Sequence, residues 1–193
     1  MKLIVGLGNP GKAYSASRHN AGFMALKALA EKHKVILKRG FLSSSLTAKL
    51  NLNDEQVILA QPLSFMNLSG SAVKPLLNKY KIGLNELLVI CDDMDLEFGR
   101  LKLRPDGSSG GHKGLNSINK SLASNGYCRL RIGVGRPHER IDPADYVLAP
   151  FNRAELKEIE GIIDEAVSCV ESWITQGLLE TMNNYNKRSK SNE

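Results

Sequence analysis

Residues 2–11 read Lys-Leu-Ile-Val-Gly-Leu-Gly-Asn-Pro-Gly, and residues 18–23 read Arg-His-Asn-Ala-Gly-Phe. The first stretch predicts a buried β-strand that ends in a glycine-rich turn, because a short apolar run is followed at once by turn-forming residues. The second stretch leads into an amphipathic run with the period of a helix. An amide, Asn9, and an imidazole, His19, are therefore expected on loops at the end of one strand, which is where open α/β sheets bind their ligands.

Gly6, Gly8 and Gly11 also match the G-x-G-x-x-G pattern of dinucleotide-binding proteins. That pattern needs its third glycine to open a helix whose N-terminus holds the pyrophosphate. In this chain the helical period starts only near Asn20, and the next apolar run ends in two basic residues instead of the acidic residue that holds a ribose. An NADP-binding protein remains as an alternative, because a basic residue suits a 2′-phosphate, and a simple tight turn is another.

Composition places the chain among ordinary globular proteins. Its 193 residues are 42% hydrophobic and 24% charged, which fits one domain with a full core. The apolar runs are shorter than the roughly 18 residues of a membrane span, and the N-terminal run is too short for the core of a signal peptide. The three cysteines are widely spaced and odd in number, which favours free buried thiols over a zinc site or disulfides. We therefore expect a cytoplasmic protein that has no contact with a membrane.

Positive charge gathers in the middle of the chain. The net charge is +6, and six basic residues fall within about thirty positions: Lys102, Arg104, Lys113, Lys120, Arg129 and Arg131. Such a surface attracts phosphates and raises the rate of encounter with a polyanion. A solvated face without a partner explains the charge alone equally well.

Alternating strand-like and helix-like segments predict an α/β fold. Strands are predicted at residues 2–7, 46–52, 56–61, 87–92, 99–104 and 129–134. Helices are predicted near residues 20–34, 68–80, 113–124, 153–175 and 178–186. A hairpin connection at 51–55 makes the sheet mixed, so we expect a single-domain, mostly parallel twisted sheet flanked by helices on both faces. This domain should cover residues 1–186, followed by a disordered polar tail at 187–193.

Two further motifs follow predicted strands. Asn67 lies in the loop after the strand at 56–61, where its side chain can donate and accept hydrogen bonds, although its spacing alone favours a cap of the next helix. Asp92, Asp93 and Asp95 end a hydrophobic strand, and buried carboxylates are costly unless they are paired or functional. Strand alternation gives Asp92 and Asp93 different surroundings. An Asp-x-Asp metal site is one interpretation, and a carboxylate–histidine pair with His19 is the other.

A glycine- and serine-rich segment, residues 107–111, precedes the helix predicted at 113–124. Glycines before a helix expose backbone N–H groups at its positive end, and Lys113 adds a charge there. This combination favours an anion site for a phosphate or a carboxylate.

In this order and spacing, four segments resemble the bacterial-type peptidyl-tRNA hydrolase family. They are GLGNPGKAYSASRHNAGF (6–23), QPLSFMNLSG (61–70), CDDMDLEFGRLKLRPDGSSGGHKGLNSI (91–118) and RLRIGVGRP (129–137). The likeness extends over nearly the whole chain. It implies a monomeric, metal-independent α/β enzyme without a cofactor, which cleaves the ester between a peptide and the terminal ribose of tRNA and so recycles tRNA.

The resemblance also implies a catalytic group of four residues. His19 would be the general base that activates water, and Asp92 would orient its imidazole. This agrees with general chemistry, since an imidazole titrates near neutrality and an adjacent carboxylate fixes its tautomer. Asn67 would hold the substrate and help to stabilise the oxyanion, and Asn9 would read the peptide amide and so distinguish a blocked from a free α-amino group.

By the same resemblance, Tyr14 and Phe65 match positions that line the site for the tRNA end. Lys102, Arg104 and Arg131 lie where the family's basic surface meets tRNA phosphates. One residue departs from the pattern: Lys113 stands where family members often have asparagine, so an amide that donates and accepts is replaced by a cation that only donates. We expect Lys113 to bind substrate phosphate instead. The alternative from another class is a non-catalytic RNA-binding relative of the same fold, which would keep the basic surface but not need the polar centre.

Overall fold

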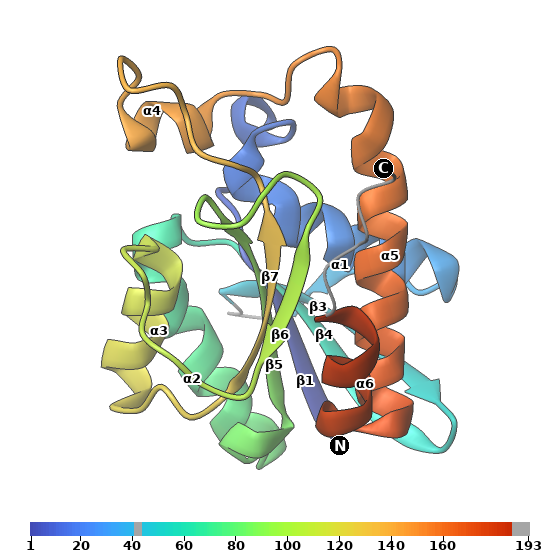
Figure 1. The fold of residues 1–193 in the computed structure, drawn as a ribbon. Coiled ribbons are helices and arrows are strands. Elements are labelled where there is room, and N and C mark those ends of the chain that lie inside the picture. Colours follow the sequence, from blue (N-terminus) through green and yellow to red (C-terminus); the bar gives the residue numbers. More distant parts are fainter. Residues whose placement is uncertain (41–43, 187–193) are drawn as a thin grey trace.

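The computed structural model describes residues 1–40 and 44–186 (Figure 1), so the polar tail expected at 187–193 lies outside the described residues. Within them, seven strands form one sheet in the order β2-β3-β4-β1-β5-β7-β6. The strands are β1 (Lys2–Gly6), β2 (Lys38–Arg39), β3 (Ser45–Leu52), β4 (Glu55–Pro62), β5 (Leu87–Asp93), β6 (Leu101–Arg104) and β7 (Cys128–Gly133).

Helices cover both faces of this sheet, as Figure 1 shows. They are α1 (Ala21–Lys32), α2 (Ser69–Tyr80), α3 (Lys113–Leu122), α4 (Pro143–Leu148), α5 (Glu155–Gln176) and α6 (Leu178–Tyr185). One apolar cluster joins α1 and α5 to one face, and a second joins α2 and α3 to the other. No helix in the described part of the chain has both the length and the apolar character that crossing a bilayer demands.

The sheet is mixed, as predicted. β1 pairs in parallel with β4 and β5, and β5 pairs in parallel with β7. Antiparallel strands extend this parallel centre at both edges, through the β3–β4 hairpin on one side and β6 on the other. Because β4, β1, β5 and β7 run in the same direction, the loops after them meet at one edge of the sheet, where a ligand site is expected.

Two elements were not predicted from the sequence. β2 has two residues, both exposed, and α4 has six residues, which is too short for an apolar period to show. Asp142 caps α4 by accepting a hydrogen bond from the Ala144 amide at 2.7 Å. A capping box opens α5: the Asn152 side chain accepts from the Glu155 amide, and the Glu155 carboxylate accepts from the Asn152 amide.

Close contact between α1 and the sheet depends on glycine. A Cβ at Gly22 would collide with the carbonyl oxygen of Ile90 and with the Leu7 backbone, and a Cβ at Gly6 would collide with the Gly22 carbonyl. The amide of Phe23 donates to the Leu7 carbonyl at 3.0 Å across this contact. The start of α1, which follows directly on His19, is thereby held against the ends of β1 and β5.

Candidate active site

A cleft of about 830 Å³ opens at the edge of the sheet where the parallel strands end. Most residues that the sequence pointed to contribute to its lining: Asn9, His19, Phe65, Asn67, Asp92, Lys113 and Arg131. They come from the loop after β1, the turn before α1, the segment after β4, the ends of β5 and β7, and the start of α3. Residues far apart in the sequence are thus collected in one cavity.

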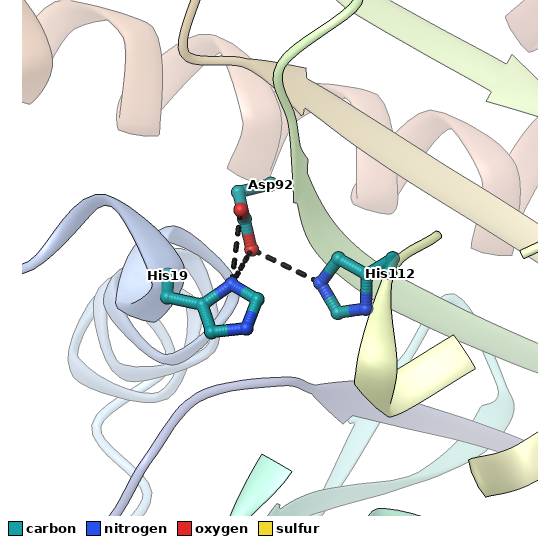
Figure 2. A group of neighbouring side chains, drawn as sticks. All are labelled: His19, Asp92 and His112. Atoms are coloured by element: carbon teal, nitrogen blue, oxygen red, sulfur yellow. Dashed lines mark hydrogen bonds and ion pairs between the residues drawn. The ribbon is translucent and has the colours of Figure 1, made fainter. Parts of the chain in front are cut away.

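In the lining of the cleft, His19 pairs with Asp92 (Figure 2). His19 lies on a 3₁₀ turn, Arg18–Asn20, and Asp92 lies near the end of β5. Nδ1 of His19 is 2.8 Å from Oδ1 and 3.0 Å from Oδ2 of Asp92. Both residues are more than 90% buried, at 7% and 4% exposure. With Nδ1 donating to the carboxylate, Nε2 of His19 keeps its lone pair, as a general base requires.

A second imidazole, His112, contacts the same carboxylate from a different direction (Figure 2). Its Nε2 lies 3.1 Å from Oδ1 of Asp92, and its ring centroid lies 4.9 Å from that of His19. Its Nδ1 accepts from the amides of Gly114 and Leu115 at 3.1 and 3.2 Å, so His112 is the N-cap of α3. Sequence reasoning assigned this segment to anion binding and missed His112, although its place directly before a helix was a usable signal.

The two imidazoles decide the charge of Asp92. Burial raises the pKa of this carboxyl, but the interactions with His112 and His19 outweigh burial and bring the pKa of Asp92 well below its usual range. Asp92 is therefore a carboxylate throughout the physiological pH range. It accepts hydrogen bonds and does not serve as an acid.

The hydrogen bonds of this group differ from those of a metal site. The ligand-type atoms of His19, Asp92 and His112 lie within 4.8 Å of one another, a spacing that metal ligands also show. Because Nδ1 of His112 accepts from two amides, its proton lies on Nε2, and that nitrogen has no lone pair to offer an ion. Metal independence of the reaction stays a prediction, to be tested with a chelator.

The two acidic residues that follow Asp92 in the motif, Asp93 and Asp95, also form ion pairs. The Asp93 carboxylate pairs with Arg131 and accepts from the Asp95 amide at 2.8 Å, while Asp95 pairs with Arg136. Burial raises the pKa of Asp93, whereas the pKa of Asp92 is lowered overall by its two imidazole partners. The two adjacent aspartates thus have different partners, as strand alternation predicted. Asp93 and Asp95, the Asp-x-Asp pair, each face an arginine.

Asn9 has a fixed orientation. Its backbone N–H donates to the Asn20 side chain at 2.8 Å, and the Asn20 amide returns a hydrogen bond to the Asn9 carbonyl at 3.0 Å. The side-chain oxygen of Asn9 accepts from the Met66 amide at 2.9 Å. Since the oxygen is occupied, the side-chain NH₂ group is what Asn9 can offer to a ligand in the cleft.

Asn67 is exposed on the 3₁₀ turn Met66–Leu68 and lines the cleft. The alternative that it caps α2 is not found, because the residue at that N-cap is Leu68 and its side chain makes no capping hydrogen bond. Phe65 is 56% exposed, an unusual state for a phenylalanine, and lies on the wall of the same cleft. The segment after β4 therefore contributes both an amide and an aromatic side chain to the cleft lining.

The residues expected to contact tRNA do not all line the cleft. Lys113 and Arg131 line the cleft, whereas Lys102 and Arg104 lie outside its lining on β6, where Lys102 is the partner of Arg131 in the strand pairing. Burial and the neighbouring Arg104 and Arg131 lower the pKa of Lys102. Tyr14 is half-buried on the 3₁₀ turn Lys12–Tyr14, and the structure does not bring it into the cleft lining.

Arg129 corrects the expectation of a uniformly exposed basic cluster. It is 2% exposed, and its guanidinium donates to the carbonyls of Gly107, Ser108 and Asn125 at 2.7, 2.9 and 2.9 Å. The same group stacks 4.5 Å from the centroid of the Tyr127 ring. Arg129 thus holds the start of the glycine-rich segment through hydrogen bonds to its carbonyls. Strand alternation places Arg129 and Arg131 on the same face of β7, so the pattern alone could not predict that only Arg129 is fully buried.

Comparison with known proteins agrees with this architecture. The model of the peptidyl-tRNA hydrolase family matches residues 3–193. Peptidyl-tRNA hydrolases from Syntrophomonas wolfei and an Exiguobacterium species are 46% and 44% identical over 186 residues, which cover 96% of this chain and the whole of each relative. A crystal structure of peptidyl-tRNA hydrolase from Acinetobacter baumannii is 34% identical, with a TM-score of 0.90 over 96% of this chain and 94% of that one. A peptidyl-tRNA hydrolase crystallised with N-propanol gives a TM-score of 0.92 at 34% identity over 99% and 97% of the two chains. This protein therefore belongs to the peptidyl-tRNA hydrolase family.

Proposed function

We propose that this protein hydrolyses the ester between a peptide and the terminal ribose of tRNA, with His19 as the general base. The observation that carries the proposal is the pairing of His19 Nδ1 with Asp92 at 2.8 Å in the lining of the cleft. This pairing leaves Nε2 as the basic nitrogen, and Asp92 stabilises the imidazolium that forms when Nε2 takes a proton.

The reaction follows from this arrangement. Nε2 of His19 removes a proton from water while the water oxygen attacks the ester carbonyl carbon. The tetrahedral intermediate then collapses, the bond between the carbonyl carbon and the ribose oxygen breaks, and the imidazolium returns its proton to that oxygen. The products are a peptide carboxyl group and a free ribose hydroxyl. Asn67, exposed on the cleft wall, supplies an N–H donor for the oxyanion.

Asn9 is proposed to select substrates with a blocked amino group. Its NH₂ group donates, because its oxygen already accepts from Met66. A peptide or N-acyl group presents a carbonyl oxygen that can accept this hydrogen bond. A free α-ammonium group carries only donors, so in the same place it would leave two donors facing one another without a partner.

The tRNA is proposed to lie across the mouth of the cleft. Phe65 offers a stacking surface for a terminal base, and Lys113 and Arg131 offer cations for nearby phosphates. Lys102 and Arg104 would extend this basic path along β6, and Tyr14 would contact the tRNA end from outside the cleft. We further propose that the protein acts as a monomer in the cytoplasm, where its substrate is produced.

The decisive experiment compares hydrolysis of N-acetylated and free-amino aminoacyl-tRNA by the purified protein in EDTA. We expect cleavage of the blocked substrate only. His19→Ala should reduce kcat by about 10³-fold or more, while tRNA affinity stays within about twofold, because the imidazole acts in the chemical step.

Hydrolysis by His19→Ala at the parental rate would exclude His19 as the base. Loss of activity in EDTA, restored by a divalent cation, would contradict a metal-independent reaction. Salt-sensitive tRNA binding without any cleavage would favour the non-catalytic RNA-binding alternative.

A further inference from the structure

We propose that His112 is a positioning residue for the reaction: the first amides of α3 hold it in one tautomer, in which it donates a hydrogen bond to Asp92 and fixes the carboxylate that orients His19. This inference rests on the roles proposed for His19 and Asp92 and adds a third group, which acts through Asp92.

The tautomer of His112 follows from its own hydrogen bonds. Nδ1 lies 3.1 and 3.2 Å from the amide nitrogens of Gly114 and Leu115. Backbone amides can only donate, so Nδ1 must accept and carries no proton. In a neutral imidazole the proton is then on Nε2, which lies 3.1 Å from Oδ1 of Asp92. A proton on Nδ1 would point at two N–H groups and at the positive end of a helix dipole.

A second donor changes what Asp92 can do. With His19 as its single partner, the carboxylate could turn about its χ angles and carry the His19 ring along with it. His112 bonds to Oδ1 from a different direction, and the planes of the two rings are inclined at 48°. Two donors from different directions restrict that rotation, and the orientation of a general base strongly affects the reaction rate.

The surroundings of His112 keep it in place. Arg129 holds the carbonyls of Gly107 and Ser108, just before the segment that leads into His112. On its other side, Gly114 is packed so closely that a Cβ there would lie 2.9 Å from the Leu7 side chain. The start of α3 therefore cannot move away from the cleft without breaking buried contacts, and His112 approaches Asp92 from a rigid support.

His112→Asn separates the two contacts of this residue. Asparagine is a good N-cap, so it can still accept a hydrogen bond from the start of α3, but its side chain is too short to reach Asp92. We expect kcat to fall by about 10- to 100-fold, KM to change by less than about twofold, and Tm to stay near the parental value. His112→Ala, which removes both contacts, should show the same fall in kcat together with a lower Tm.

A parental kcat in His112→Asn would overturn the proposal, as would a fall in kcat that follows Tm across the two variants. His19→Ala, measured alongside, separates this failure from failure of the proposed mechanism. If His19→Ala is inactive and His112→Asn is fully active, only the role of His112 is wrong. If His19→Ala is active, the mechanism itself is wrong.

Nitrogen-15 NMR of the parental protein provides a test that does not depend on a variant. The imidazole nitrogens of His112 should show the shifts of the Nε2–H tautomer, with Nδ1 unprotonated. Signals of the Nδ1–H form would contradict the proposal, because Nε2 would then have no proton to donate to Asp92.

Discussion

Asn9 shows how one hydrogen bond determines what a residue can recognise. Its side-chain oxygen is taken by the Met66 amide at 2.9 Å, which leaves only donors for the substrate. Asn9→Asp would keep an oxygen for Met66 and present a second, negatively charged oxygen to the cleft. We expect the preference for a blocked over a free α-amino group, measured as a ratio of kcat/KM values, to fall by about 100-fold or more.

The control for this change is Asn51→Asp on β3, which adds the same charge on the hairpin and should leave the ratio unaltered. An unchanged ratio in Asn9→Asp would show that another residue reads the amino end of the substrate. If Asn9→Asp lowered kcat/KM for the blocked and the free-amino substrate by the same factor, the conclusion would be the same.

The three cysteines are buried and protected from reaction. Burial raises the pKa of the Cys91 thiol far above its usual range and that of Cys169 to about 12, and it also raises the pKa of Cys128. Since the thiolate is the reactive form, a chromogenic disulfide reagent at pH 8 should label the three thiols only after unfolding. Rapid labelling of the native protein would contradict this burial.

These raised values also predict how stability depends on pH. The folded protein binds thiol protons more tightly than the unfolded chain, whose thiols ionise at roughly pH 8.5. The stabilisation is therefore complete below that pH and is lost as the pH rises toward the folded pKa of Cys169, about 12. The free energy of unfolding in urea should decrease between pH 8.5 and 10, and the Cys169→Ser variant should show a smaller decrease.

Among the elements, α1 makes a contact with the sheet that requires the absence of a side chain at Gly22. A methyl group at Gly22 would collide with backbone atoms of Ile90 and Leu7, which cannot move without disturbing β1 and β5. Gly22→Ala should therefore destabilise the protein by about 3 kcal/mol, measured by urea unfolding. Because the His19 turn leads directly into α1, kcat should fall in the same variant even under conditions where it is folded.

Gly161→Ala is the matched control. Gly161 is an exposed residue within α5, and a Cβ there would meet no atom within 4 Å. Alanine restricts the unfolded chain and favours the helix, so this change should stabilise the protein by about 0.5–1 kcal/mol. Equal effects at the two positions would mean that the α1 contact is not tight.

α4 shows why some elements escape prediction. It is held in place by Arg18, a buried residue from the turn before α1. The Arg18 guanidinium donates to the carbonyls of Ala149 and Pro150 at 3.3 and 2.9 Å and stacks 4.2 Å from the Tyr146 ring centroid. The same guanidinium pairs with Glu155 at the start of α5 at 2.6 Å. These contacts join segments more than a hundred positions apart, and no local pattern in the sequence reports them.

At the scale of the molecule, positive charge lies near the cleft and on β6. Arg104→Gln and Lys102→Gln should each weaken tRNA binding and make its salt dependence shallower by about one unit of log–log slope, with kcat at saturation nearly unchanged. Lys27→Gln, an exposed position on α1, removes the same charge elsewhere and should leave the slope as it is. Equal slopes in all three variants would place the tRNA away from β6.

Local patterns in the sequence determined the class of fold and most elements. The strand that ends at Gly6 and the hairpin between β3 and β4 agree with prediction because their signals arise from neighbouring residues. The resemblance of four segments to a known family named the cleft residues His19, Asp92, Asn9 and Asn67, which the fold brings together.

Contacts across the chain decided the remaining features. His112 bonds to Asp92, twenty positions earlier in the sequence, and Asp93 pairs with Arg131. Arg129 is buried and donates to the carbonyls of residues 107 and 108. These contacts could not be predicted from the sequence alone, because the partner of a side chain depends on which strands and loops the fold places beside it. The same physical reason explains why the tautomer of His112 and the donor role of Asn9 became visible only in the tertiary structure.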